Sequence, residues 1–524
     1  MKKYWSIILI SLISLLSVGL FLYKLTSSPP CLNADEAANG YDAYSILKTG
    51  KDQYGNSLPL RLKSFGDYKL PLLTYLSIPF IGLFGLNEFG VRMVNFPFVL
   101  FFPFVVYLLT IELFNKKSTG VLAAFLLAFT PGLQLLSRQA HEGYLTAFFL
   151  TLSFYLFLKF FKKQNVLNFS FFILSFLLTL FGYHSSRLWA GFFLLVSIFY
   201  VFKKKIKWFF PVLLVIVISI FGATDLTNNP TRIQNLLFFK NLGFSLKINE
   251  LRAEGGSRLI YNKLTMGIKD VTSEYSRYFS PQFLAISGDE NYRFGFPGIS
   301  PMTPVEYVFI FIGFYFLFRN KEKWRYLITF MFLFSPASAA LSWAGLSVTR
   351  SIFIFIPALI ISAYGMISLL NRKNLLLILL IIIGYLLFNF YSWDFYLNHY
   401  PKRATVIRSW QCGYKKLTSY VSAKYKNFDR FYVTKKNGQP YIFFLFYLNY
   451  PPTLYQQSAQ LTAPDVYGFG QVESFDKFVF DLPEKTVKNS VLIGFPDDFT
   501  DLEKPHLKEI KVDQEEIFLI KEVR

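Results

Sequence analysis

The chain has 524 residues, of which 53% are hydrophobic and 20% aromatic, and its mean hydropathy is +0.37. So many apolar segments, each close to the roughly 20 residues that cross a bilayer, are not typical of a soluble protein. The formal charge of +21 would suggest nucleic-acid binding in a soluble protein, but short basic clusters between the apolar runs account for much of it. The composition therefore predicts a polytopic membrane protein with no nucleic-acid partner.

The apolar segments predict eleven spans with the N-terminus in the cytoplasm. The first segment is long for a signal peptide and no small-residue cleavage site follows it, so we expect an uncleaved span. The predicted spans lie near 4–23, 90–112, 119–136, 143–161, 166–183, 187–202, 208–222, 303–318, 326–343, 350–370 and 375–391. With this order the positive-inside rule is satisfied by every basic cluster. The clusters are Lys2–Lys3, Lys116–Lys117, Lys162–Lys163, 203–207, 319–325 and Arg372–Lys373.

The segment 71–86 is ambiguous. It is short, it contains Pro71 and Pro79, and as a span it would move all later basic clusters to the outside. We therefore predict an interfacial or re-entrant piece of the first outer loop.

The same topology places most of the unusual polar residues on the extracytoplasmic face. Asp35 and Glu36 lie at the start of the first outer loop, 24–89. Two adjacent carboxylates cost free energy to desolvate, so chemistry at the membrane surface explains them as readily as a solvated loop does. The other outer segments are 137–144, 182–187, 223–302, 344–350 and everything after about residue 392.

The candidate site residues share this outer face. They are the acids Asp35, Glu36 and Glu142, the cations Lys69, Arg138, Arg187 and Arg350, and the possible lining residues Tyr68, His141 and His184. A carboxylate can act as general base towards an acceptor hydroxyl or amine. Lysine and arginine can hold a phosphate and stabilise the charge that develops as it leaves. The set therefore suits a transfer from an anionic, lipid-linked donor.

Structural roles stay open for the same residues. The three arginines lie at span ends, where basic side chains often reach lipid headgroups. The two histidines are more often hydrogen-bonded structure than metal ligands, and no spacing requires a metal, although a divalent ion could bridge carboxylates and phosphate. Glu142 beside a span needs a partner, and Arg138, four residues earlier, would face it if that stretch is helical.

The order of these motifs resembles a known family. The acidic pair, the YKLP segment with Lys69, the stretch GLNEFGVRMVNFPFVLFFPFVVYLLTIELF and SRQAHEGY are similar to the polyprenyl-phosphate-sugar-dependent GT-C glycosyltransferases. Within these, the chain resembles the bacterial protein mannosyltransferase and aminoarabinose transferase branch, over roughly 1–370 and most specifically over 31–190. The resemblance implies an all-α, multispanning bundle and a direct displacement with inversion at the sugar. It also implies Asp35 as base, Lys69 and Arg350 as donor-phosphate contacts, and Glu142 as the second-loop acid.

The chain departs from this family at three points. Ala37, Ala38 and Asn39 follow the acidic pair where the aminoarabinose branch has an arginine. Glu142 stands where the eukaryotic mannosyltransferases have an aspartate, and YKLP replaces their histidine-proline motif. The donor sugar and the acceptor, whether protein, lipid or polysaccharide, therefore stay open. No cofactor is required.

Two domains are predicted. Residues 1–391 form the transmembrane module, and 392–524, with alternating β-branched and aromatic runs, form an extracytoplasmic α/β domain with a helix around QPYIFFLFYLNY. The loop 223–302 is expected to fold over the site, with Asp289, Glu290 and Arg293 solvated and outside it. Cys31 and Cys412 both lie on the outer side, where disulfides persist. A bridge would tie the first loop to the C-terminal domain close to Asp35, but we favour unpaired cysteines.

Two other functions remain as alternatives. A transporter or flippase would carry charged residues in the middle of its spans, and the predicted spans carry few. A non-catalytic assembly subunit of the envelope would tolerate the loss of Asp35 and Lys69.

Overall fold

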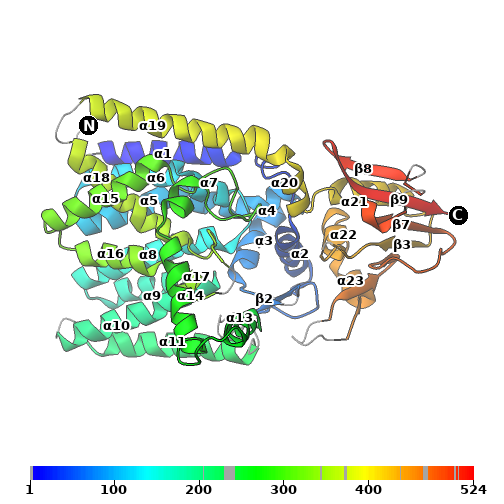
Figure 1. Cartoon of the computed structure of the whole chain (residues 1–524), viewed down its shortest axis with the longest axis horizontal. Helices are drawn as coiled ribbons and strands as arrows, with labels where there is room; N and C mark the ends of the chain where they lie inside the picture. Colours follow the sequence, from blue (N-terminus) through cyan, green and yellow to red (C-terminus); the bar gives the residue numbers. More distant parts are fainter. Residues whose placement is uncertain are drawn as a thin grey trace. The chain divides into compact units, whose positions relative to one another are not determined.

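The computed structural model shows two compact units whose segments alternate along the chain (Figure 1). The first, which we call the helical unit, comprises Met1–Tyr23, Asn95–Ser137 and His141–Phe395. The second, the mixed unit, comprises Lys24–Val94, Arg138–Ala140 and Tyr396–Arg524. The structure describes residues 4–65, 67–203, 206–228, 242–342, 345–370, 375–436, 438–463, 470–500, 503–504 and 507–524.

Helices that pack side by side form the helical unit (Figure 1). They are α1 Trp5–Leu22, α5 Phe96–Phe114, α6 Lys117–Phe129, α7 Pro131–Ser137, α8 Glu142–Lys162, α9 Val166–Leu180, α10 Leu188–Phe202, α11 Phe209–Asn228, α13 Leu242–Ala253, α14 Lys263–Arg277, α15 Pro304–Arg319, α16 Arg325–Phe334, α17 Ala337–Ala340, α18 Phe355–Leu370 and α19 Leu375–Asp394. Short turns, η2 His184–Arg187, η4 Gln282–Ile286 and η5 Ile352–Ile354, join some of them. Helices α15 and α18 pack closely, because a Cβ on Gly365 would lie 2.7 Å from the backbone nitrogen of Gly313.

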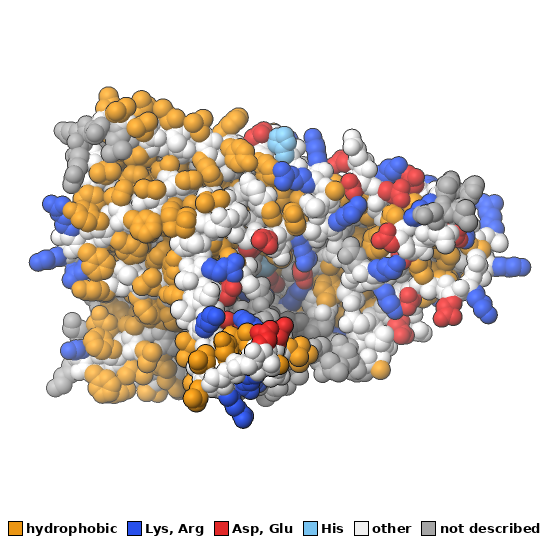
Figure 2. Space-filling view, in the orientation of Figure 1, with side chains coloured by type: hydrophobic (Ala, Val, Ile, Leu, Met, Phe, Trp, Pro, Cys, Tyr) orange, Lys and Arg blue, Asp and Glu red, His pale blue; other side chains and the backbone are white. Residues whose placement is uncertain are grey.

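The surface of this unit is that of a membrane protein. Figure 2 shows hydrophobic side chains over most of its visible face, with Lys and Arg side chains at the helix ends. Within the described residues, six helices are long and apolar enough to cross a membrane, or seven if the bent pair α6 and α7 forms one span. These helices are Trp5–Leu22, Glu88–Phe114, Glu142–Lys162, His184–Phe202, Ile352–Leu370 and Ile378–Lys402.

The prediction of eleven spans is not confirmed. The segments expected at 166–183, 303–318 and 326–343 form helices of 15, 16 and 10 residues. At 1.5 Å per residue, the shortest of these rises only about 15 Å, half of the hydrocarbon core. The sidedness of the spans stays a prediction, and Lys2–Lys3, Lys204–Lys205 and Arg372–Lys373 lie outside the described residues.

The N-terminal half of the mixed unit is built around one helix, α2 Ala34–Thr49. Against it packs α3 Leu72–Phe84, a helix of 13 residues that contains Pro79 and corresponds to the ambiguous segment 71–86. The side chain of Thr74 on α3 donates a hydrogen bond of 3.2 Å to Asn39 on α2. The hairpin of β1 Leu62–Ser64 and β2 Asp67–Lys69 and the short helix α4 Glu88–Arg92 complete this half. The interfacial placement of α3 stays a prediction.

The C-terminal half carries a sheet of seven strands. Their order is β4-β5-β6-β3-β7-β9-β8, and β3 pairs in parallel with β6 and β7 while the other neighbours are antiparallel. The strands are β3 Arg430–Val433, β4 Gln460–Leu461, β5 Val472–Phe475, β6 Phe478–Val479, β7 Ser490–Gly494, β8 Lys508–Val512 and β9 Glu515–Val523. The helices are α20 Ala404–Ser409, α21 Tyr414–Lys424, α22 Tyr441–Tyr447 and α23 Pro452–Ser458. The strand-containing C-terminal region and the helix expected around QPYIFFLFYLNY are confirmed.

The expectation that the two cysteines are unpaired is wrong. Cys31 and Cys412 form a disulfide, with their Cα atoms 5.6 Å apart and a sequence separation of 381. The bond joins the segment that precedes α2 to the segment that precedes α21. The first outer loop and the C-terminal half of the mixed unit are therefore covalently linked.

Candidate functional site

Asp35 lies in the first turn of α2, and a capping box explains why the helix starts there. The side chain of Asn33 accepts a hydrogen bond of 3.0 Å from the Glu36 N–H, and the Glu36 carboxylate accepts one of 3.4 Å from the Asn33 N–H. Acidic residues in the first turn also interact favourably with the helix dipole. The local sequence thus fixes the position of both acids.

Asp35 forms an ion pair with Lys69. The Lys69 ammonium lies 2.9 Å from the Asp35 carboxylate and 3.4 Å from its backbone oxygen. Lys69 is the last residue of β2, where the hairpin pairs it with Leu62, and half-buried Tyr68 precedes it on the same strand. The Asp35 side chain is 42% exposed and that of Lys69 16%. Two residues that the sequence singled out therefore meet, and the acid remains accessible.

Glu36 has a different environment, because its side chain is only 2% exposed. It pairs with Arg92 through two contacts of 3.3 Å, and one of its oxygens also accepts a hydrogen bond of 3.0 Å from the Ala140 N–H. These contacts tie α2 to α4 and to the segment 138–140. They indicate that Glu36 holds the structure around Asp35.

Arg92 supports the candidate site, and the sequence analysis missed it. It is fully buried and donates to the carbonyl oxygens of Leu25, Pro29 and Cys31 at 2.8, 3.1 and 2.6 Å, in addition to Glu36. It therefore orders the segment that enters α2. A guanidinium within an apolar run needs a buried partner, and this signal was present in GLNEFGVRMV.

Arg138 is also buried and fixed to the backbone. Its guanidinium donates to the carbonyl oxygen of Ser28 at 3.1 and 2.8 Å and lies over the Tyr396 ring at 5.6 Å. The conditional expectation of a helical pair with Glu142 is wrong, since α7 ends at Ser137 and α8 begins at Glu142. In the described geometry Arg138 supports the chain before α2.

The C-terminal half of the mixed unit holds α2 along its length. The Ala34 N–H donates to the Gln411 side chain at 3.2 Å, next to the disulfide, and the Tyr41 hydroxyl donates to the Tyr450 carbonyl at 2.9 Å. Between them, a Cβ on Gly40 would lie 2.8 Å from the Phe446 ring. Only glycine allows α22 to pack this closely on α2.

A second acid of α2, Asp42, lies two turns after Asp35 and is 2% exposed. It accepts hydrogen bonds from the backbone and side chain of Gln53 at 3.1 and 3.2 Å. Burial raises the pKa of Asp42 to about 7; nearby Asp52 adds to the rise, and Gln53 and Lys69 oppose it. This group therefore changes charge near neutral pH.

In the helical unit, two of the five predicted residues line a polar cavity of about 680 Å³. Arg350 lines it, and its Nη1 donates to the Ser342 hydroxyl at 2.8 Å. His141 also lines it, packed on the rings of Tyr183 and Phe294 at 5.5 and 4.8 Å. Other lining residues are Arg277, Gln282, Glu290 and Asn291.

Asp289 corrects the prediction that the acids of the long loop are solvated. It is 4% exposed, and its carboxylate accepts hydrogen bonds from the N–H groups of Val348 and Asn291 at 2.7 and 2.9 Å. Tyr278 holds the same segment, since its hydroxyl accepts from the Ser347 N–H at 3.1 Å. Burial raises the pKa of Asp289, and Arg350 opposes the rise. Asp289 and Tyr278 thus fix the loop that carries Arg350.

Glu142 and His141 are neighbours at the start of α8. His141 caps the helix through a hydrogen bond of 2.9 Å from the Gly143 N–H to its Nδ1, and its Nε2 lies 3.9 Å from the Glu142 carboxylate. Both side chains are 14% exposed. His184 and Arg187 lie on the 3-10 turn η2, where the Arg187 guanidinium lies over the Phe221 ring at 5.8 Å.

The predicted site residues therefore form two groups. The mixed unit contains Asp35, Glu36, Tyr68, Lys69 and Arg138, and the helical unit contains His141, Glu142, His184, Arg187 and Arg350. Within the described ranges, no group of three or more His, Cys, Asp or Glu side chains is placed to hold a metal ion.

Comparison with known proteins gives a family model that matches a third of the chain and solved structures with a similar fold. Residues 50–223 match the family model described as dolichyl-phosphate-mannose-protein mannosyltransferase. The oligosaccharyltransferase of Archaeoglobus fulgidus, in a complex with zinc and sulfate, is similar with a TM-score of 0.50 at 13% identity, over 84% of this chain and 61% of that one. A search of curated proteins finds no match.

Two further structures give TM-scores below 0.5. AglB from Archaeoglobus fulgidus, with an inhibitory peptide and a dolichol-phosphate, has 14% identity and a TM-score of 0.49, and the chain spans 64% of its length. In that comparison 85% of this chain is covered. ArnT from Cupriavidus metallidurans, bound to undecaprenyl phosphate, has 10% identity and a TM-score of 0.47, with 97% of each chain covered. The resemblance to the GT-C glycosyltransferases is confirmed by the family match and by the fold.

Proposed function

Because this chain matches the mannosyltransferase family model over residues 50–223 and has a GT-C fold, we propose that it is a membrane glycosyltransferase with a polyprenyl-phosphate-linked sugar donor. The acceptor is an extracytoplasmic protein, lipid or polysaccharide. Asp35 is the general base, and Lys69 contacts the donor phosphate. No cofactor is needed for this reaction.

The different environments of the two adjacent acids carry this proposal. Glu36 is buried against Arg92, whereas Asp35 is 42% exposed and lies 2.9 Å from the Lys69 ammonium. An accessible carboxylate beside a half-buried cation is the arrangement that a proton acceptor and a phosphate contact require. The buried pair beneath it supplies the rigidity that positions such a base.

The proposed step is a single displacement. The acceptor oxygen or nitrogen attacks the anomeric carbon and transfers its proton to the Asp35 carboxylate. The bond between that carbon and the phosphate oxygen breaks, and the polyprenyl phosphate leaves with the electron pair. Lys69 stabilises the added negative charge, and a single displacement inverts the anomeric configuration. For the helical unit, the family resemblance supports a proposed role for Arg350 as a phosphate contact and for Glu142 as the second-loop acid.

The disulfide supports an extracytoplasmic reaction. Cys31 is four residues before Asp35, and disulfides persist in oxidising compartments outside the cytoplasm. We therefore propose that the mixed unit faces the outside of the membrane.

The test is sugar transfer by the purified, reconstituted protein. A panel of polyprenyl-phosphate sugars would be offered with envelope extract as acceptor. Asp35→Asn should lower turnover by roughly 100-fold or more, the scale of a lost general base. Lys69→Ala should lower it too, and should raise the donor KM.

A matched control is Asp481→Asn, which removes the same charge from an exposed ion pair with Lys435. Its turnover should equal that of the wild type. Full turnover of a folded Asp35→Asn variant would remove Asp35 as the base. A folded wild-type protein that consumes no donor would favour the transporter or assembly-subunit alternatives.

A further inference from the structure

The hairpin formed by α13 and α14, residues 242–277, exposes an apolar face that the proposed reaction does not use. Leu259 is 86% exposed, Leu242 73% and Leu264 71%. Leu246, Ile260 and Ile268 are exposed as well, at 57%, 60% and 61%. Clustered apolar side chains of this size mark a surface that contacts something other than water.

The hairpin is nevertheless folded, with a small core of its own. Phe244, Ile248 and Met266 are buried between the two helices. The Asn262 side chain caps α14 by accepting from the N–H groups of Leu264 and Thr265 at 2.9 and 3.1 Å. Gly255, at φ 97°, makes the turn after α13. The exposed apolar face is therefore additional to the face that the hairpin needs in order to fold.

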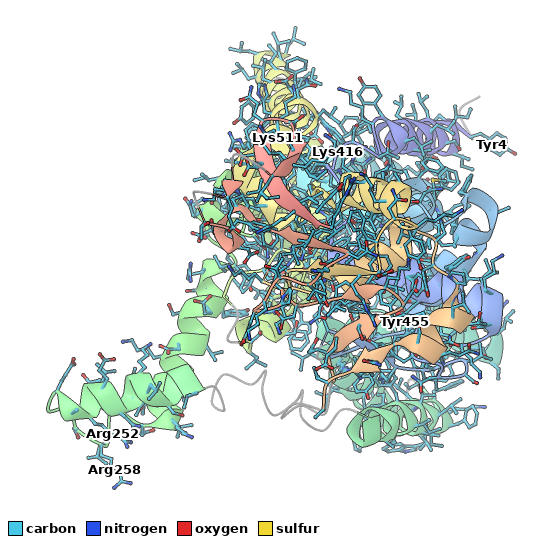
Figure 3. The ribbon with its side chains drawn as sticks, turned by 90° about the vertical axis from the view of Figure 1, so that its right-hand side faces the viewer. Tyr4, Arg252, Arg258, Lys416, Tyr455 and Lys511 are labelled. Carbon is cyan, nitrogen blue, oxygen red and sulfur yellow. A yellow bond between two sulfur atoms is a disulfide. The ribbon has the colours of Figure 1, made fainter. Side chains whose placement is uncertain are left out.

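The hairpin also lies across the direction of the long helices. In Figure 1, α1, α10 and α19 run across the view, whereas α13 is seen end-on. Figure 3 looks along the horizontal axis of Figure 1, and there the hairpin extends sideways beyond the other helices of the helical unit, with Arg252 and Arg258 at its tip. Where the long helices cross a bilayer, a hairpin that runs across their direction lies along its surface.

The charge of the hairpin suits an anionic surface. It has six basic and four acidic side chains, for a net charge of +2. Two of the acids are already paired within it, Asp270 with Lys247 at 2.8 Å and Glu274 with Arg277 at 2.7 Å. The tip, residues 250–263, has the bases Arg252, Arg258 and Lys263 and the acids Glu250 and Glu254, and so a net charge of +1. Figure 3 shows Arg252 and Arg258 at this tip.

An apolar groove runs along the same face. It has a volume of about 540 Å³ and is lined mainly by Leu264, Ile268 and Val271 of α14 together with Leu341. Lys263 also lines it. A hydrocarbon chain beneath an anionic headgroup matches this combination of apolar lining and adjacent cation.

We propose that the apolar face of the hairpin docks at the boundary between headgroups and acyl chains of the membrane, with its basic tip on anionic lipid headgroups. The proposal does not depend on the transferase reaction. Docking of the hairpin would affect the position of the Arg350 loop, because α14 is followed in the chain by Tyr278 and Asp289, which hold that loop. Tyr275 of α14 also donates to the Leu333 carbonyl at 2.7 Å. Docking would thus set the height of the Arg350 cavity relative to the membrane surface.

Depth-dependent quenching in the full-length protein tests this. Since the two native cysteines are joined, Leu264→Cys provides a single thiol for a fluorophore on the apolar face. Ser273→Cys is the matched control, because nine residues place it about 180° away on the same helix. Both proteins would be reconstituted in vesicles of phosphatidylcholine and phosphatidylglycerol with brominated acyl chains.

The label at 264 should be quenched, and more strongly by bromines near the headgroup end of the chains than near the methyl end, as expected for burial of about 5–10 Å. The label at 273 should be quenched much less and should be accessible to iodide. Adding Arg252→Glu and Arg258→Glu should reduce quenching at 264 only when phosphatidylglycerol is present. Equal iodide access and no lipid quenching at both positions would overturn the proposal. Shielding of 264 that depends on protein concentration or on added acceptor would also overturn it, in favour of a protein partner.

Discussion

Asp35 and Glu36 are adjacent in sequence but have separate roles in the structure. A sequence that reads Asp-Glu cannot show which acid is buried, because that depends on Arg92, 56 residues after Glu36. The exposed acid keeps the capacity to react, and the buried acid is committed to a guanidinium. The two should therefore respond differently to the loss of charge.

Glu36→Gln should destabilise the protein far more than Asp35→Asn. Neutralising Glu36 leaves the fully buried Arg92 without its counter-charge, a loss of roughly 3 kcal/mol or more in unfolding free energy. Neutralising the more exposed Asp35 should cost under about 1 kcal/mol. Thermal unfolding in detergent measures both, and turnover should be lost in Asp35→Asn at an almost unchanged Tm. Equal shifts in Tm would contradict the separation of roles.

Asp42 should make stability depend on pH. Its pKa is raised from 3.8 to about 7 by burial, so the folded state binds its proton more tightly than the unfolded state. The stability from this group is therefore complete below about pH 4 and is lost as pH rises to about 7, a change of roughly 4 kcal/mol. Unfolding of Asp42→Asn between about pH 5 and pH 8 should show a smaller fall than the wild type. If the unfolding free energies of the wild type and of Asp42→Asn changed with pH in parallel, Asp42 would not be the cause of the pH dependence.

At the scale of elements, the sequence predicts which segments form helices and strands better than it predicts where a helix is interrupted. The apolar runs correctly indicate membrane-spanning helices, and the C-terminal pattern correctly indicates strands with a buried helix at Tyr441–Tyr447. The breaks are not visible in hydropathy. The helix expected over 326–343 ends at Phe334, just before Pro336, and α6 and α7 meet at 58° where Pro131 begins the second helix.

The elements that carry the candidate site show the same limit. Asp289 was predicted to be solvated because its own sequence, GDEN, is that of a loop. It is buried because Val348, 59 residues later, donates to its carboxylate. Lys69 could be predicted from its motif, whereas Arg92 and Asp289 depend on partners that no local pattern reveals. A helix produces a periodic pattern of apolar residues in the sequence, whereas a long-range hydrogen bond produces no recognisable pattern.

At the scale of the whole molecule, the disulfide links Cys31 to Cys412 across a sequence separation of 381 residues. The disulfide and Gln411 hold the N-terminal end of the helix that carries Asp35, and α22 holds its middle. The C-terminal half of the mixed unit therefore acts as a support for the proposed base.

Cys412→Ala should accordingly lower both stability and turnover. Loss of the bridge should cost roughly 2–5 kcal/mol of unfolding free energy. It should also reduce turnover by about tenfold or more, because small displacements of a catalytic group are costly. Cys31→Ala and the double variant should match Cys412→Ala, since each removes the same bond. A reductant should slow the wild type to the same rate and leave the variants unchanged. Wild-type turnover in a folded Cys412→Ala protein would show that the position of Asp35 does not depend on the C-terminal half.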